Sequence, residues 1–450
     1  MNKPSVFNQY MQQYSTAGKW KLIAPAFENV SQVIVIPAYA EKEMLFSTLA
    51  FLARNQSSSL AYSFILCVIN NKKSSPGEVK ANNQQTLKYL KALVGKFCLN
   101  SLNTNEELRN NLKMISDSDL RIGYIDASSE GYEIPDIAGG VGMARKIGMD
   151  AALCLLQGNS SFKKLIISLD ADTLVQNNYL AAIKNYFTGK VKTAVVAYQH
   201  QESSTDEGKA AIYCYEIFLR YWVLGLKYAK SCYAYHSIGS TMVCSTDAYL
   251  AVRGMNRREA GEDFYFLNKL AKIGNIGYIK DTCVYPSARA SLRVPFGTGK
   301  RIQRFLTGRH EEYVLYNPRI FEILAEWLLL MKQAFHYDEK EIMEKAGLID
   351  PILASFLTDC NFMHVWSRIR RNVRDEDNLI KQFNCWFDGF KTLKLINHLS
   401  RSSFPPIDMF TALDSLLKMQ KIAAPHAMIA SNPPALAIQK KILQYLREIT

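Results

Sequence analysis

Residues 165–173 read LIISLDADT, an apolar run of strand length that ends in two aspartates. Side chains alternate along a strand, so Asp170 and Asp172 share one face if the strand continues, and a turn makes them converge. Carboxylates at the carboxyl end of a buried strand, in the crevice of an open α/β sheet, suit a divalent cation that bridges a diphosphate. The triplet alone is common by chance and more often marks a solvated turn, so the rest of the chain must decide.

Other apolar runs of strand length alternate with helical patterns around this stretch. The β-branched run Val33–Ile36 is followed by Pro37, which we expect to stop the strand, and a second buried run, Phe64–Ile69, is ended by Asn70 and Asn71. Further strands are expected at 122–125 and 193–198, and helices at 41–55, 86–97, 142–156 and 179–187. This alternation predicts an α/β fold with a mainly parallel, Rossmann-like sheet and flanking helices.

The alternation ends near residue 319. From there to residue 450 the apolar residues follow helical spacing, interrupted by a linker-like segment at 402–406. We therefore expect three parts: an N-terminal arm (1–30), an α/β domain that carries the acidic motif (31–318) and a helical C-terminal region (319–450).

The composition is that of a soluble globular protein, with 48% hydrophobic and 21% charged residues among 450. No run reaches the roughly 18 to 20 apolar residues that a membrane helix requires, and we see no secretory signal. The nine cysteines are scattered without C-x-x-C pairs, which favours reduced thiols in a cytoplasmic enzyme. The net charge of +13 predicts attraction to anions such as nucleotides, phosphorylated acceptors or acidic lipid.

Four further motifs accompany the acidic triplet, and they read IPAYAE (36–41), GGVGMARK (139–146), IGSTMV (238–243) and GEDF (261–264). The first ends a strand, where a loop can meet a nucleobase or ribose. The second opens a helix whose glycines allow close backbone approach and whose Arg145 can offer a fork to phosphate. Each motif has a plain structural explanation as well, since glycines make turns and an acidic pair such as Glu262 and Asp263 usually caps a helix dipole.

In this order, across roughly residues 31–285, the motifs resemble those of GT-A fold glycosyltransferases, especially the family 2-like enzymes. The resemblance implies transfer of a sugar from a nucleotide-diphosphate sugar to an acceptor hydroxyl, with Mn²⁺ or Mg²⁺ as cofactor. It implies that Asp170 and Asp172 form the metal and diphosphate site. Asp263, with Glu262 beside it, becomes the candidate base of an inverting displacement, although retention stays open.

The same resemblance implies that the donor is held by residues from several segments, namely Pro37, Tyr39, Glu41, Asn70, Arg145 and Asp170. Two arginines of the basic stretch 289–301, Arg293 and Arg301, are expected either to neutralise the leaving group from a lid or to belong to a solvated loop. The chain departs from the family pattern where acidic residues usually end the second strand, because it has Asn70 and Asn71 there. An amide donates as well as accepts, so base preference is expected to differ or to be relaxed.

Two other departures bear on the metal and on processivity. The stretch 282–286, where the family often has a metal-binding histidine, contains none, and a lone histidine such as His310 is more often structural. The segment 301–305 lacks the glutamine and tryptophan spacing of processive membrane synthases, so processive synthesis across a membrane is not expected.

Two alternatives to a glycosyltransferase remain open. A nucleotidyltransferase acting on a sugar phosphate uses a similar sheet and metal, but it usually has a glycine-rich basic signature after the first strand. A non-catalytic nucleotide-binding or scaffold protein is compatible with the positive charge, whereas nucleic-acid binding is not expected, because the bases form no aromatic-interleaved patch. The acceptor is expected to be a glycan, a lipid-linked molecule or a small molecule.

The C-terminal region contains a basic run at 368–374 beside Phe362, Met363 and Trp366. Such an amphipathic basic segment can dock on anionic lipid, which would add peripheral contact with the inner face of the membrane to a cytoplasmic location. It can equally be a solvated helix face, the more common case.

Overall fold

The structure is a computed structural model, and it describes residues 5–97, 104–157, 162–291, 297–308, 310–423 and 433–450. The chain forms two compact units that are discontinuous in sequence. The first, called the sheet unit, consists mainly of Met1–Gln201 and Ser237–Ala288, and the second, called the helical unit, mainly of Glu202–His236 and Thr298–Thr450. The predicted domain boundaries at residues 30 and 318 stay predictions.

The sheet unit is built on a mixed sheet with nine strands among the described residues, in the order β1-β4-β3-β2-β5-β8-β7-β9-β6. The strands are β1 (Leu22–Ile23), β2 (Gln32–Ala38), β3 (Ser63–Asn70), β4 (Ile122–Ala127), β5 (Leu165–Ser168), β6 (Leu174–Val175), β7 (Thr193–Tyr198), β8 (Met242–Ser245) and β9 (Gly277–Tyr285). Strands β4, β3, β2 and β5 pair in parallel, as do β7 and β9, while β1, β6 and β8 pair antiparallel to their neighbours. This confirms the predicted mainly parallel α/β sheet.

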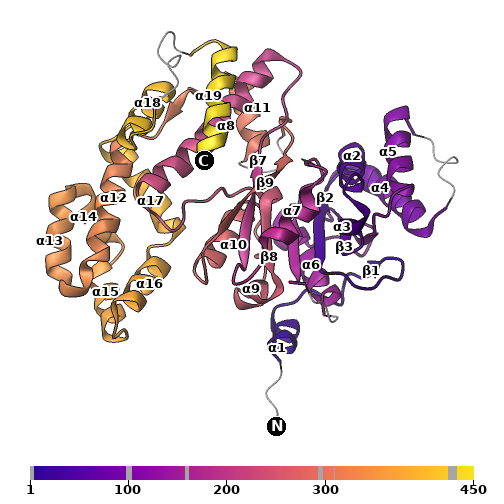
Figure 1. Ribbon diagram of the computed structural model, residues 1–450, viewed down its shortest axis with the longest axis horizontal. Helices are drawn as coiled ribbons and strands as arrows, with labels where there is room; N and C mark the ends of the chain where they lie inside the picture. Colours follow the sequence, from indigo (N-terminus) through magenta and orange to yellow (C-terminus); the bar gives the residue numbers. More distant parts are fainter. Residues whose placement is uncertain (1–4, 98–103, 158–161, 292–296, 309, 424–432) are drawn as a thin grey trace. The chain divides into compact units, whose positions relative to one another are not determined.

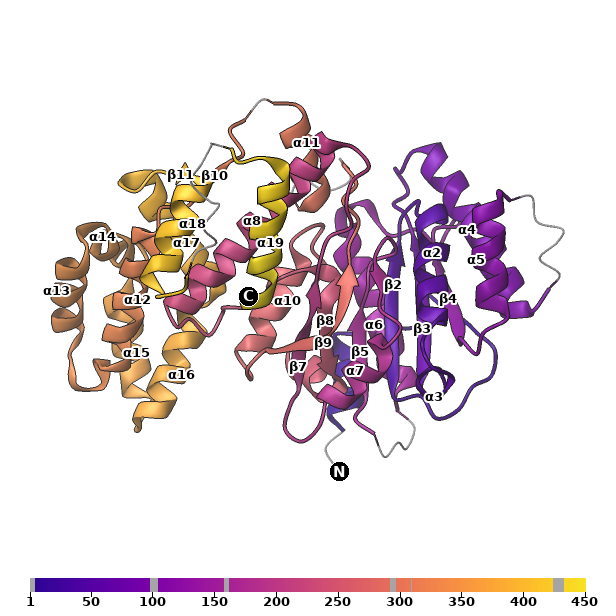
Figure 2. The ribbon, with the colours of Figure 1, turned by 45° about the horizontal axis from the view of Figure 1, so that its top comes forward.

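Helices flank this sheet (Figures 1 and 2). They are α1 (Val6–Gln13), α2 (Lys42–Ala53), α3 (Ser57–Leu60), α4 (Gly77–Gly95), α5 (Glu106–Ser116), α6 (Val141–Leu155), α7 (Tyr179–Tyr186), α9 (Thr246–Ala251) and α10 (Glu262–Ala271), with short 3-10 turns η2 (Asp136–Ala138) and η3 (Gly239–Thr241). Every position of β2 and β3 is buried, which explains why both strands read as continuous apolar runs. Helix α4 begins nine residues before the predicted helix at 86–97. Its first turns are polar and carry no apolar periodicity, so the sequence did not indicate them.

Pro37 does not end its strand, contrary to the sequence prediction. It pairs in register with Val68, and β2 continues to Ala38. The pairing of β2 with β5 ends at Val35, so beyond this residue β2 has a strand neighbour on one side. A proline is tolerated there because no ladder hydrogen bond from its missing N–H is required on the open side.

Helix α6 lies unusually close to the sheet. A Cβ atom placed on Gly148 would lie 2.3 Å from Val35 Cγ1 and 2.9 Å from Val68 Cγ2. Only glycine therefore allows α6 to pack at this distance. The close packing brings Arg145, one turn earlier on α6, to the carboxyl end of β5.

The helical unit contains α8 (Asp206–Tyr228), α11 (Thr298–Leu306), α12 (Arg319–Lys332), η4 (Ala334–His336), α13 (Glu339–Ile349), α14 (Pro351–Asp359), α15 (Phe362–Arg371), α16 (Glu376–Trp386), α17 (Gly389–Ser402), α18 (Met409–Met419) and α19 (Leu436–Ile449), with a small sheet of β10 (Val314–Leu315) and β11 (Ile407–Asp408). An aromatic core around Trp327 holds several of these helices together. Buried Glu216 on α8 accepts two hydrogen bonds from Arg447 on α19, which joins the two helices. None of the helices that the structure describes has the length and hydropathy of a transmembrane span.

Candidate active site

The two aspartates of the acidic motif lie at the point where the strand order of the sheet reverses. From β2 the chain builds outward through β3 and β4, whereas β5 pairs with the other edge of β2. Ligands of open α/β sheets bind outside the carboxyl ends of strands at such a point. Asp170 and Asp172 follow β5 directly, in a turn closed by a hydrogen bond from the Thr173 N–H to the Asp170 carbonyl (3.2 Å). The structure therefore places the motif where the sequence predicted it.

Arg145 organises this turn. Its side chain is buried, its Nε donates to Ser168 Oγ (3.0 Å), and its two terminal nitrogens pair with Asp170 and Glu262. A guanidinium can make all three contacts at once because its donors form a rigid planar fork, whereas a lysine offers one ammonium. The end of β5 and the start of α10 are far apart in sequence, and the Arg145 guanidinium joins them.

Ser240 holds the second oxygen of Asp170. Its hydroxyl donates to Asp170 Oδ2 (2.6 Å) and lies 2.9 Å from Thr173 Oγ1. Ser240 comes from η3, within the IGSTMV motif, and both hydroxyl side chains are fully buried. Ser240 has no predicted role although its motif stands out in the sequence, because a serine in a run of small residues carries no signal of its partner.

Asp172 is half-buried in the same turn. The turn is attached to neighbouring segments through its backbone: Gln201 Nε2 donates to the Asp172 carbonyl (3.1 Å), and Thr48 Oγ1 donates to the Ala171 carbonyl (2.9 Å). Gln201 also donates to the Tyr285 carbonyl at the end of β9 (2.7 Å). The backbone around Asp172 is therefore held by Thr48 of α2 and by Gln201, which also contacts the end of β9.

Glu262 and Asp263 open α10 in its first turn. Glu262 is buried against Arg145, while Asp263 is half-buried and its Oδ1 accepts the Phe264 N–H (2.7 Å). The backbone carbonyl of Glu262 accepts from Asn256 Nδ2 (2.9 Å). The buried ion pair shows that Glu262 does more than interact with the helix dipole from a solvated surface.

The cluster holds more negative than positive charge. Burial alone would lower the pKa of Arg145, but Asp170, Glu262 and Asp263 outweigh burial and raise it. Burial raises the pKa of Glu262 to about 7, with Arg145 opposing and Asp263 adding to the rise. Burial also raises the pKa of Asp263, again against the effect of Arg145. One guanidinium cannot neutralise three carboxylates, so the cluster holds a proton up to near-neutral pH.

This arrangement predicts how stability depends on pH. The pKa of Glu262 is raised in the folded protein from an ordinary value of 4.5, so between pH 4.5 and 7 the folded state binds more protons than the unfolded state. The free energy of unfolding therefore falls as the pH rises through this window, by an amount on the order of 3 kcal/mol. We expect Glu262→Gln to flatten this slope, measured as unfolding midpoints from pH 4.5 to 8. The exposed control Glu130→Gln should leave it unchanged, and an equal slope in Glu262→Gln would contradict the assignment.

The glycines before α6 contact protein backbone. The Gly142 N–H donates to the Arg258 carbonyl (3.2 Å), and a Cβ atom on Gly142 would lie 2.3 Å from that oxygen. Gly140 has a φ of 137°, and a Cβ atom there would lie 2.5 Å from the Cα of Glu259. These glycines make room for the loop that precedes α10, which supports the turn interpretation of the motif.

The segments predicted to hold the nucleotide meet at the carboxyl ends of β2 and β3. Asn83 of α4 bridges them, because its Oδ1 accepts the Ala40 N–H (3.0 Å) while its Nδ2 donates to the Asn70 carbonyl (3.0 Å) and to Asn71 Oδ1 (2.8 Å). Asn70 is 5% exposed, and its buried Oδ1 has no hydrogen-bond partner in the part of the chain that the structure describes. A buried acceptor without a partner calls for a donor from a ligand or water.

The other predicted donor residues of this edge lie beside these amides. Pro37 is in β2, Glu41 is buried at the start of α2, and Tyr39 is half-buried. The Tyr39 hydroxyl donates to Ser75 Oγ (3.3 Å), which links the loop after β2 to the turn after β3. The structure thus brings Pro37, Tyr39, Glu41 and Asn70 to one edge, while their contact with a nucleotide stays a prediction.

The structure bears differently on Arg293 and Arg301, the two arginines predicted to lie near the leaving group. Arg293 lies outside the described residues. Arg301 belongs to the helical unit, where its guanidinium pairs with Glu312 (3.1 Å) and lies 5.0 Å from the Phe218 ring centroid. Glu312 is also paired with Arg304. Arg301 is therefore committed to a pairing within its own unit, and its role at the donor stays a prediction.

The basic run of the C-terminal region lies at the end of α15. The Arg370 guanidinium donates a hydrogen bond to the backbone carbonyl of Tyr337 within the helical unit. Arg371 donates to Ser367 Oγ (3.1 Å). Arg368 and Met363 are exposed. Contact of this segment with anionic lipid stays a prediction.

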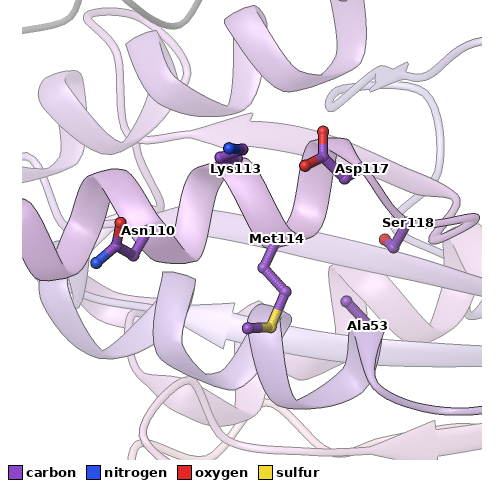
Figure 3. A pocket seen from close by; sticks show the side chains of 6 residues that line it. All are labelled: Ala53, Asn110, Lys113, Met114, Asp117 and Ser118. Carbon is purple, nitrogen blue, oxygen red and sulfur yellow. The ribbon is translucent and has the colours of Figure 1, made fainter.

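A separate surface hollow of about 530 Å³ lies between α5 and the end of α2 (Figure 3). It is lined by Ala53, Asn110, Lys113, Met114, Asp117 and Ser118. Helix α2 begins after the carboxyl end of β2, so its last residues lie toward the opposite edge of the sheet. The hollow includes none of the predicted site residues.

Two residues, Asp170 and Asp172, are the candidates to hold a metal ion. Among the described residues, no group of three or more histidine, cysteine or acidic side chains is arranged to bind an ion. Mg²⁺ and similar cations are often held by one or two carboxylates together with substrate phosphates and waters. Asp170 and Asp172 fit that donor set, whereas they would not make a complete protein cage.

Comparisons with known proteins add a distant structural likeness. No family model and no curated protein matches the chain. Among solved structures, the mannosyltransferase PcManGT from Pyrobaculum calidifontis, in complex with GDP-Man and Mn²⁺, aligns over 98% of this chain and 91% of its own, with 10% identity and a TM-score of 0.36. S. aureus TarS 1-349 in complex with UDP-GlcNAc aligns over 78% and 90%, with 13% identity and a TM-score of 0.33. At such scores the site itself has to support any functional proposal.

Proposed function

We propose that this chain is a metal-dependent glycosyltransferase that moves a sugar from a nucleotide-diphosphate sugar to an acceptor hydroxyl. The observation that carries the proposal is the buried Arg145, which pairs with both Asp170 and Glu262. It supports a single site made of the acidic strand end and the E-D helix, at the edge of the sheet where ligands bind. Two unrelated solvated turns would have no reason to share a buried cation.

The donor nucleotide would lie across the ends of β3, β2 and β5. Asn70 offers its buried, unpartnered Oδ1 to an N–H group of the base, and the contacts of Asn83 keep the neighbouring backbone rigid. Asp170 and Asp172 would hold Mn²⁺ or Mg²⁺, which supplies Lewis-acid stabilisation of the leaving diphosphate. Arg145, Ser168 and Ser240 position Asp170 for this task.

Asp263 is the proposed general base. Its oxygen removes the proton of the acceptor hydroxyl while that hydroxyl oxygen forms a bond to the anomeric carbon. The bond from the anomeric carbon to the diphosphate oxygen breaks, and its electron pair leaves with the nucleoside diphosphate. One displacement of this kind inverts the anomeric centre. The raised pKa of Asp263 suits a base that must accept a proton near neutral pH.

Nucleotide binding tests the donor site. We expect one member of the panel ADP, CDP, GDP and UDP to raise the melting temperature of the wild type with Mn²⁺ and not with EDTA. We expect Asp172→Ala to lose this rise, because it removes one of two metal-holding carboxylates, while its own melting temperature without ligand changes little. Asp119→Ala, in the exposed turn before β4, is the control. No rise with any diphosphate would contradict the donor site, and a rise that persists in Asp172→Ala would contradict the role of Asp172.

A further inference from the structure

Lys72 lies at the junction of the segments that surround the candidate site. It follows Asn70 and Asn71 directly, and its N–H donates to Ser75 Oγ (3.0 Å), the same hydroxyl oxygen that accepts from Tyr39. Residue 72 also bridges to Ile134, in the loop before α6. This backbone position is therefore held by contacts to Ser75 and to Ile134, and Lys72 had no part in the sequence prediction.

The Lys72 side chain passes over Gly139 and reaches the loop that precedes α10. A Cβ atom on Gly139 would lie 2.2 Å from Lys72 Cε and 2.6 Å from its Cγ, so the glycine makes room for the lysine stem. The Lys72 ammonium pairs with Glu259, whose side chain is 60% exposed. Glu259 stands three residues before Glu262 in the loop whose backbone packs on Gly140 and Gly142.

The cations around the site differ in how much positive charge they can offer to a diphosphate. Arg145 is already surrounded by carboxylates, so it has no net positive charge to offer a diphosphate. Arg258, next to Glu259 in the same loop, lies with its guanidinium carbon 3.5 Å from the centroid of the Tyr265 ring. Lys72, in contrast, is held by a largely exposed carboxylate, and such surface ion pairs contribute little free energy and exchange easily.

We propose that Lys72 binds a phosphate group of the donor and that it leaves Glu259 when it does so. The inference rests on the proposed function and adds a residue and a coupling to it. The exchange would free the Glu259 side chain, in the loop that leads to Glu262 and Asp263, from the β3 side of the site, while the backbone of that loop keeps its contacts with Gly140 and Gly142. Donor binding at one edge is thereby coupled to the segment that carries the base.

The test is a double-mutant cycle of nucleotide affinity, measured by calorimetry with the diphosphate that binds the wild type best among ADP, CDP, GDP and UDP, in the presence of Mn²⁺. We expect Lys72→Met to weaken binding about tenfold, since a charge-assisted contact to phosphate is lost. We expect Glu259→Gln to tighten binding about threefold, because it removes the competitor for Lys72. The double variant should bind like Lys72→Met, since without Lys72 the carboxylate has nothing to compete for.

Lys73→Met is the matched control, because Lys73 is the exposed neighbour in sequence and its removal changes the net charge equally. It should bind the diphosphate as the wild type does. Wild-type affinity in Lys72→Met, or weaker binding in Glu259→Gln, would overturn this inference and leave the proposed function in place. A wild type that binds none of the four diphosphates would instead overturn the proposed function, and this inference with it.

Discussion

Replacing Arg145 by methionine is expected to lower the free energy of unfolding of the sheet unit by about 3 to 5 kcal/mol at pH 7.5. The substitution keeps most of the buried volume, but it leaves Asp170 and Glu262 without their cation, and the Glu262 side chain is 5% exposed. Removing one partner of a buried ion pair costs more than the pair contributes, because the remaining charge stays desolvated. For a unit of this size the melting temperature should fall by roughly 6 to 20 °C.

Scanning calorimetry measures this effect, because it can resolve the transitions of two units in one chain. The loss should shrink at pH 5, where the abandoned Glu262 carboxyl group can take up a proton. Arg145→Lys should lose less, since the charge remains while the fork does not. The exposed Arg109→Met, on α5, should stay within about 0.5 kcal/mol of the wild type. A pH-independent loss would mean that Arg145 contributes packing rather than charge.

Asp263→Asn is expected to abolish most sugar transfer and to keep donor binding. An amide cannot accept the acceptor proton, and general base catalysis typically contributes a factor of 10² to 10⁴. The turnover number should therefore fall by that factor. Because asparagine has the shape of aspartate, the affinity for the nucleoside diphosphate should change by less than about twofold.

Asp247→Asn provides the matched control for this prediction. Asp247 is also an acidic residue in the first turn of a helix, α9, and it is exposed. If Asp263 merely interacted with the helix dipole, the two variants would behave alike, with small losses of stability and unchanged turnover. A fall in turnover confined to Asp263→Asn separates the two explanations.

Strands β2, β3, β4, β5 and β7 could be predicted because each is a self-contained apolar run, whereas β9 alternates buried with exposed positions and gave no such signal. The runs Val33–Ile36, Phe64–Ile69 and Leu165–Leu169 owe their pattern to burial on both faces, which is a local property of the sequence. Helix α5 was missed, since its few buried residues, Leu108, Leu112 and Ile115, are dispersed among polar ones.

The partners of Arg145 could not be predicted in the same way. The sequence placed Arg145 near a phosphate because it follows a glycine cluster at a helix start, whereas the structure pairs it with two carboxylates of other segments. Spacing along the chain says nothing about which distant side chains converge. The contact of Ser240 with Asp170 and that of Lys72 with Glu259 escaped prediction for the same reason.

The most direct experiment compares the wild type with Asp263→Asn for release of nucleoside diphosphate from a panel of nucleotide sugars, with Mn²⁺ and a mixture of candidate acceptors. We predict release from one nucleotide sugar by the wild type, its loss with EDTA, and a fall of 10² to 10⁴ in Asp263→Asn. Equal release by both proteins would contradict the role of Asp263. No release from any nucleotide sugar by a folded wild type would contradict the glycosyltransferase account itself.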